Sequence, residues 1–192
     1  LNERANSLFG KAGMGLEYLL LKRGPMTMAP SQLGVFTKSD DYLETPNLQY
    51  HVQPLSLDRF GGPLHPFPAI TASVCNLRPD SRGQIRIISP DARTAPSIRP
   101  NYLSAETDRQ IAANALKLTR RIVAAPAMEK FEPEEYLPGP QVASDEDLAR
   151  AAGDIATTIF HPVGTCKMGR DDLAVVDDHL RLRGLQGLRI AD

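Results

Sequence analysis

The stretch LQYHVQ at residues 48–53 decides the fold, because apolar and polar side chains alternate along it. A period of two places Leu48, Tyr50 and Val52 on one face, which is typical of a half-buried antiparallel strand. We expect the strand within residues 47–58, with a bulge or an edge at Pro54, because proline cannot donate to a ladder of hydrogen bonds. The stretch therefore predicts an antiparallel sheet with one buried face.

Three other stretches indicate strands around this one. Residues 69–77 alternate with Ile70, Ala72 and Val74 on one face, residues 84–89 are rich in isoleucine, and a short strand is expected at 34–37. Residues 90–101 hold three prolines and are predicted to form an extended loop.

Three helices are expected. The first is confined to residues 16–22, since Gly13 and Gly15 weaken the stretch before it and Gly24-Pro25 stops it. Ser104 is expected to cap a long helix that ends at Pro126, with an apolar face formed by the following residues: Ile111, Ala115, Leu118 and Ile122.

Ser144 is expected to cap the third helix, with Asp147 in the place of a capping-box acid. The final part, at 174–176, 180–183 and 188–191, is predicted as short strands. These elements predict an α+β fold, a mostly antiparallel sheet with two principal helices on one face.

Composition excludes several classes of protein. The 192 residues are 42% hydrophobic and 23% charged, with a net charge of −1, which is an ordinary globular balance. A nearly neutral chain has no electrostatic reason to bind nucleic acid, and no apolar run reaches the ~20 residues of a membrane span. With no secretory signal and two separated cysteines, Cys75 and Cys166, we expect reduced thiols and a cytoplasmic location.

The densest local signal is FHPVGTCKMG at residues 160–169, directly after the third helix. Pro162 forces His161 out of helical geometry, and Gly164 and Gly169 permit tight turns beside it. A stiff frame of this kind suits a general base whose position must be fixed. Spacing alone favours a plainer alternative, a helix-terminal histidine that hydrogen-bonds a carbonyl group.

The histidine motif resembles that of the glucose–methanol–choline oxidoreductases, especially the choline-dehydrogenase-like branch. The resemblance runs in the family's order from about residue 16 to the end of the chain. Its other stretches are these: PNLQYH at 46–51, LRPDSRG at 77–83 followed by Ile85 and Ile87, PNYLS at 100–104 followed by Asp108, and GLQGLRIAD at 184–192.

The resemblance implies an enzyme that oxidises a primary alcohol, choline or another, by hydride transfer to FAD. His161 would be the base that takes the hydroxyl proton, because imidazole accepts a proton near neutral pH. Phe160 would line the substrate pocket, although a core position is an equal alternative. Ala191 and Asp192 resemble the start of the segment that contacts the flavin.

The departures from the family are as informative as the matches. The glycine-rich turn that holds the flavin pyrophosphate is missing, since Gly13-Met14-Gly15 has no third glycine and follows no strand. The second catalytic His or Asn of the family would lie beyond residue 192. We therefore expect a C-terminal portion that neither binds FAD nor turns over by itself, with an exposed apolar surface that favours a homodimer.

The resemblance also implies a division of the chain. Residues 1–45 would lead in from a missing flavin domain, residues 46–160 would form the substrate-binding domain, and residues 161–192 would carry the catalytic histidine and return to the flavin domain. The electron acceptor, oxygen or a carrier, stays open.

Two alternatives remain open on the sequence. One is a stand-alone, non-catalytic binding module with the substrate-domain fold, and the other is an enzyme with Cys166 as nucleophile. No metal site is expected, because His51, His65 and His179 show no ligand spacing; each is expected to be exposed or structurally satisfied.

Overall fold

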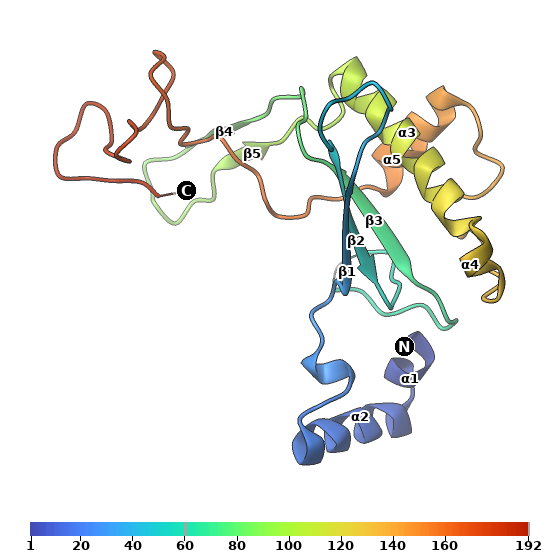
Figure 1. Ribbon diagram of the computed structural model, residues 1–192. Coiled ribbons are helices and arrows are strands. Elements are labelled where there is room, and N and C mark those ends of the chain that lie inside the picture. The colour runs from blue at the N-terminus through green and yellow to red at the C-terminus, as the bar shows by residue number, and fades with distance from the viewer. Residues whose placement is uncertain (60, 192) are drawn as a thin grey trace. The chain divides into compact units, whose positions relative to one another are not determined.

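A computed structural model describes residues 1–59 and 61–191. They fall into two compact units (Figure 1). Unit 1 consists of Leu1–Asp80 and Leu103–Ala156, and unit 2 consists of Ser81–Tyr102 and Thr157–Asp192. The division of the chain expected from the sequence, at residues 45 and 160, stays a prediction.

The sheet of unit 1 has three antiparallel strands in the order β1-β2-β3. They are β1 (Leu33–Thr37), β2 (Leu48–Gln53) and β3 (Thr71–Asn76). Tyr50 of β2 lies opposite Val35 on one side and Val74 on the other. All three predicted strands are confirmed. β2 is shorter than the predicted range because it ends at Gln53, the residue before Pro54. Proline has no backbone N–H group to donate to the ladder, so the strand does not continue through it.

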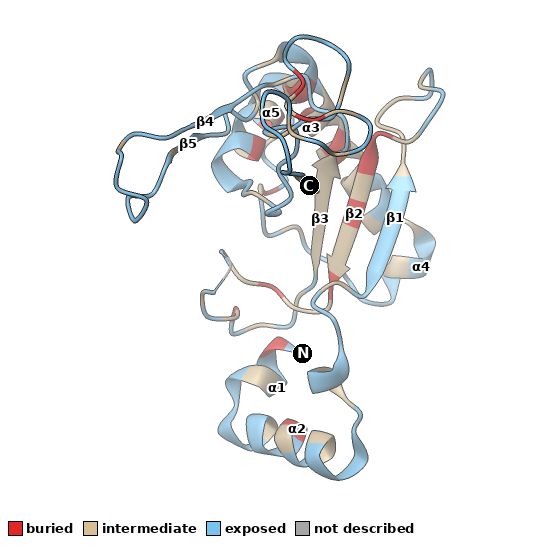
Figure 2. Ribbon diagram, turned by 90° about the vertical axis from the view of Figure 1, so that its left-hand side faces the viewer, coloured by how far each residue is buried: buried red, intermediate tan, exposed pale blue. Residues whose placement is uncertain are grey.

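The helices α3 (Glu106–Val123) and α5 (Asp145–Ile155) build the core on one face of this sheet (Figure 1). Tyr50 is 2% exposed, and its hydroxyl group donates to the carbonyl oxygen of Ala115 at 3.3 Å. Leu148 of α5 is fully buried. Figure 2 shows the buried β2 between the exposed β1 and the half-buried β3. The predicted fold, helices on one face of an antiparallel sheet, is confirmed.

The two predicted caps have different outcomes. The Ser144 hydroxyl accepts from the Asp147 amide at 3.1 Å, as expected. Ser104 does not cap α3, because the N-cap is Ala105 and its side chain makes no capping bond. Asp108, 4% exposed, instead accepts from the Asp80 amide at 2.9 Å and ties the turn after β3 to the first turn of α3. Pro126 does not extend α3; it opens the short helix α4 (Pro126–Glu129).

The helical part at the N-terminus is longer than predicted. It consists of α1 (Asn2–Asn6), α2 (Leu8–Leu21) and a turn of 3-10 helix, η1 (Pro25–Thr27). Ser7 separates the helices, and its hydroxyl caps α2 by accepting from the Gly10 amide. The prediction of residues 16–22 was wrong because a glycine inside a helix costs only about 1 kcal/mol. The leucine-rich remainder of α2 tolerates that cost.

Unit 2 contains little regular structure. The strands β4 (Gln84–Arg86) and β5 (Ser97–Arg99) form an antiparallel pair. The predicted strand 84–89 is therefore too long, and β5 lies where a loop was predicted, between two prolines that keep it short. The terminal strands predicted from residue 174 onward were also wrong. They are reduced to isolated bridges, among them Met168 with Val176 and Arg181 with Arg189.

Within the described part of the chain, no helix combines enough length with enough apolar character to cross a membrane.

Candidate active-site segment

The backbone around His161 is tightly turned. Phe160 has a φ of 63° and Gly164 a φ of 93°, on either side of the His161-Pro162 pair. The Phe160 amide donates to the Thr158 hydroxyl at 3.0 Å, and that hydroxyl also accepts from the Tyr102 hydroxyl at 3.1 Å. Thr158 thus fixes the entry to the turn from two directions, and Pro162 restricts the exit.

The His161 side chain is exposed and makes no hydrogen bond or ion pair to any residue that the structure describes. The plainer alternative requires a hydrogen bond from the His161 side chain to a helix-terminal carbonyl group, and no such bond is formed to any described residue. An exposed imidazole on a restricted turn can accept a proton from a molecule that docks there. The role of His161 as a base stays a prediction.

Phe160 is 68% exposed and does not belong to the core. A φ of 63° is rare for a bulky side chain, and strain of this kind clusters at functional sites. The side chain of Phe160, next to the candidate base in the sequence, is thus at the surface, which agrees with the predicted substrate contact without testing it.

The chain after His161 is held by backbone contacts to later segments. The Lys167 carbonyl accepts from the Val175 amide at 2.9 Å, and the Gly169 amide donates to the Val176 carbonyl at 3.2 Å. The Arg183 guanidinium adds bonds to the carbonyl oxygens of Gly169 and Asp171, at 2.8 and 2.9 Å. Val176, 1% exposed, is the centre of this small cluster.

This folding brings the chain just after His161 close to the chain just before Ala191. A hollow of about 90 Å³ is lined by Val163 and Gly164, just after His161, and by Ile190, just before Ala191. Ala191 itself is exposed, and Asp192 lies outside the described residues. The hollow is well below the ~300 Å³ at which small-molecule pockets begin, so the described residues around it do not enclose a flavin, and the flavin contact of Ala191 and Asp192 stays a prediction.

Cys166 also lines the hollow and is half-buried. No histidine that the structure describes makes a hydrogen bond to its sulfur, so the pair that thiol catalysis needs is not formed within the described residues. Cys75 is a free thiol of β3; burial raises its pKa, and a hydrogen bond to the Gln49 carbonyl lowers it less.

His51 is a residue whose importance the sequence did not reveal. It lies on β2 at a position that alternates with Tyr50, so it belongs to the sheet face opposite α3. Its Nε2 atom is buried and has no hydrogen-bond partner among the described residues. The expectation that His51 is exposed or satisfied was therefore wrong. A buried orphan nitrogen costs about 1–3 kcal/mol, so this face is suited to a polar partner from outside the described residues.

His65 confirms the structural alternative. Its Nδ1 and Nε2 atoms lie 3.0 Å from Ser56 Oγ and 2.9 Å from Asp58 Oδ1. Asn2, fully buried, donates to the Ser56 hydroxyl at 2.8 Å and accepts from the Ser56 amide at 3.0 Å. The Ser-His-Asp order resembles a catalytic triad, but Ser56 is only 7% exposed and its hydroxyl is occupied by Asn2. The cluster joins α1 to the loop after β2.

Comparison with known proteins agrees with this geometry. A family model described as GMC oxidoreductase matches residues 79–192. The chain is 38% identical over 184 residues to the oxygen-dependent choline dehydrogenase of Chromohalobacter salexigens, covering 96% of this chain and 33% of that protein. It is 38% identical over 175 residues to the alcohol dehydrogenase [acceptor] of Pseudomonas putida, covering 91% of this chain and 32% of that protein.

A solved structure shares the fold. Pyridoxine 4-oxidase from Mesorbium loti aligns with a TM-score of 0.74 and 26% identity, over 85% of this chain and 32% of that one. The chain thus spans about a third of the length of the curated relatives it matches. The family model covers more than half of the chain, and it includes the histidine motif and the returning stretch at 184–191. The resemblance seen in the sequence is confirmed, and the chain belongs to the GMC oxidoreductase family.

Proposed function

We propose that this chain is the substrate-side part of a longer FAD-dependent enzyme that oxidises a primary alcohol. The observation that carries the proposal is His161, which is exposed, has no hydrogen-bond or ion-pair partner among the described residues and lies on a strained turn, within a motif that the family model covers. In this role the His161 imidazole accepts the hydroxyl proton of the alcohol, and the Phe160 ring packs beside the carbon that bears it. The flavin, held by the longer protein, supplies the redox chemistry.

The relatives named choline dehydrogenase and alcohol dehydrogenase support a small alcohol as substrate, choline or a neutral primary alcohol. The chain alone does not retain FAD, because its described residues do not enclose a flavin around that hollow and its sequence has no glycine-rich phosphate turn. Exposed leucines of α2, among them Leu16 and Leu20, support a homodimer or another covering partner in the longer protein.

The test is made on the longer protein, with visible absorbance as the signal. Bound flavin should bleach anaerobically when choline or a primary alcohol is added. His161→Gln keeps a polar side chain of similar size but cannot act as the base, so we expect the bleaching rate to fall by about 10²–10⁴-fold with flavin still bound. His179→Gln is the matched control, since His179 is exposed and lies in unit 2 as well.

The outcomes separate the alternatives. Equal bleaching in the His161→Gln variant would place the base elsewhere. A longer protein without bound flavin would favour the non-catalytic binding module. Loss of activity on Cys166→Ser, with none on His161→Gln, would favour the thiol enzyme.

A further inference from the structure

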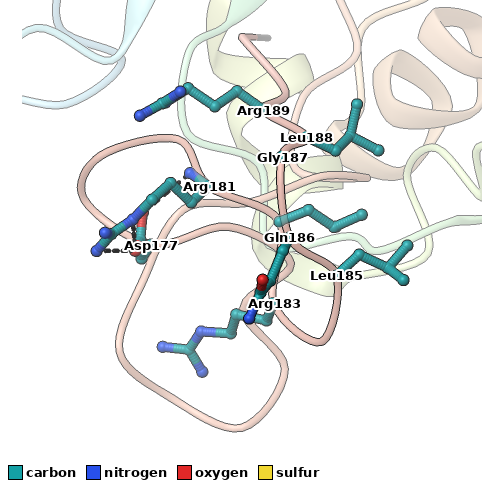
Figure 3. Close-up of a pocket in the computed structure, with 9 residues that line it drawn as sticks. Asp177, Arg181, Arg183, Leu185, Gln186, Gly187, Leu188 and Arg189 are labelled. Carbon is teal, nitrogen blue, oxygen red and sulfur yellow. Dashed lines mark hydrogen bonds and ion pairs between the residues drawn. The ribbon is translucent and has the colours of Figure 1, made fainter.

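The arginine loop, residues 181–189, surrounds a pocket that none of the chemistry above uses. The pocket measures about 440 Å³ and is lined by Asp177 and by every residue of the loop except Gly184 (Figure 3). That volume falls in the ~300–1,000 Å³ range of small-molecule sites. No residue of the histidine motif lines it.

The charge of the pocket is positive. Arg181 is neutralised by Asp177, whose Oδ2 lies 2.7 Å from the guanidinium. Arg183 and Arg189 have no carboxylate partner among the described residues; Arg183 bonds two carbonyl oxygens, and Arg189 bonds the His179 carbonyl at 3.2 Å. Because a guanidinium carries five N–H donors, both side chains keep unused donors and an unbalanced charge.

The backbone of the loop adds further donors. The amides of residues 184–187 donate no hydrogen bond to any described residue. Gly184 and Gly187 have φ values of 85° and 79°, and a Cβ built on either glycine would meet open space. Amides that flank left-handed residues form concave nests that bind anions, above all phosphate.

The side chains of the loop are sorted by polarity. In Figure 3, Arg181, Arg183 and Arg189 point to one side of the loop, while Leu185 and Leu188 point to the other. The leucines are 63% and 50% exposed. The arginine side is therefore the one that an anion would meet.

We propose that the arginine loop binds a phosphate group, either free or carried by a small organic molecule. Two unbalanced guanidinium groups match the nearly double charge of a phosphate, and arginine forks bind phosphate oxygens in pairs. The pocket shares no lining residue with the histidine motif, and this proposal does not depend on the proposed function.

The experiment titrates the 192-residue chain with inorganic phosphate and, separately, with glycerol 3-phosphate, at low ionic strength, followed by 31P NMR line width and calorimetry. Both probes should bind, and Arg189→Gln should weaken binding at least tenfold, since it removes a charged hydrogen-bond donor. Arg93→Gln is the matched control, because Arg93 is exposed, paired with Asp91 and outside the loop. The affinity of this variant for both phosphate probes should equal that of the unchanged chain.

Arg189→Lys keeps the charge and loses the fork, and it should bind with intermediate affinity. Tighter binding of glycerol 3-phosphate would identify an organic phosphate as the source, and equal binding would identify free phosphate. The proposal is overturned if chloride at matched ionic strength displaces both probes equally well, or if Arg189→Gln binds like Arg93→Gln while its far-ultraviolet circular dichroism is unchanged.

Discussion

Unit 1 and unit 2 are held together by different forces. In unit 1, Tyr50 of β2 packs on α3, and α3 packs on α5; Leu48 of β2 is 1% exposed, and Leu148 of α5 is fully buried. In unit 2, the buried apolar residues of the described chain are only Ala174 and Val176, and the backbone is joined by bridges and by the Arg183 bonds. Unit 1 is a packed frame, whereas the candidate catalytic turn lies in a segment with little core of its own.

The difference suggests that unit 1 supplies stability and that unit 2 supplies a surface that can adapt to a ligand. Packing fixes the frame over many contacts, so single exposed changes there have small effects. A segment held by a few hydrogen bonds can be shaped by what docks on it, which suits the role proposed for His161.

The largest effect should come from the core of the frame. Leu148→Ala leaves a cavity between α5 and α3, so we expect the free energy of unfolding to fall by about 2–5 kcal/mol. Urea denaturation of the chain, followed by circular dichroism, measures it. Leu185→Ala in unit 2 is the matched control, and at 63% exposure it should change stability by less than about 0.5 kcal/mol. Equal losses of unfolding free energy in the two variants would contradict the difference in packing between the units.

A smaller effect should come from the polar cluster of unit 1. Asn2→Ala leaves the buried amide of Ser56 without its partner and removes one of the two partners of the Ser56 hydroxyl, which should cost about 1–3 kcal/mol. The same denaturation experiment measures the loss. Asn6→Ala removes bonds to the Leu64 and His65 carbonyls nearer the surface, and its cost should be smaller. If Asn6→Ala proved the more harmful change, the cluster would not be what fixes α1.

A local effect is expected in unit 2. Arg183→Gln removes the bonds to the carbonyls of Gly169 and Asp171, so the amides of Val175 and Val176 should exchange with solvent roughly three- to tenfold faster. Hydrogen exchange read by NMR tests this, with the amides of β2 and β3 as internal references. Arg86→Gln is the control, because Arg86 is exposed on β4. Faster exchange throughout unit 1 would mean that Arg183 supports more than its own segment.

The smallest effect concerns pH. Partial burial raises the pKa of Asp177, but hydrogen bonds from the Arg181 amide and guanidinium and from the His179 amide outweigh it and hold the pKa at about 2. A carboxyl group whose folded pKa is depressed stabilises the fold above its unfolded pKa of ~3.9 and loses that contribution as pH falls toward 2. An NMR titration should find the low value, and Arg181→Gln should raise it; an unchanged pKa in that variant would contradict the assignment.

Much of unit 1 could be predicted from the sequence, because its signals are local. The alternation around Tyr50 gave the strand and its buried face, and Ser144 with Asp147 gave the start of α5. The prediction that failed in unit 1 was the restriction of the first helix to residues 16–22. The glycines of α2 lower its helix propensity, but its leucines outweigh that loss.

Unit 2 and the site were harder to predict, because their determinants are distant in the sequence. The terminal stretches have the residue types of strands, yet they pair only at isolated bridges such as Val176 with Leu182. His161 was singled out by its motif and its proline. The orphan nitrogen of His51 could not be foreseen, because alternation gives a side chain its face of the sheet but not the partners it finds there.

The outer edge of β1 has a consequence for handling the protein. β1 pairs with β2 on one side, and among the described strands none pairs with the other, while Leu33 and Phe36 on it are 64% and 62% exposed. Natural sheets protect such edges with charges, prolines or bulges, and LGVFT has none of the first two. At high concentration the isolated chain should therefore associate through strand-to-strand pairing. Phe36→Lys should keep it monodisperse without disturbing the buried side of β2, because Phe36 lies opposite Gln49 and therefore on the other face from Tyr50.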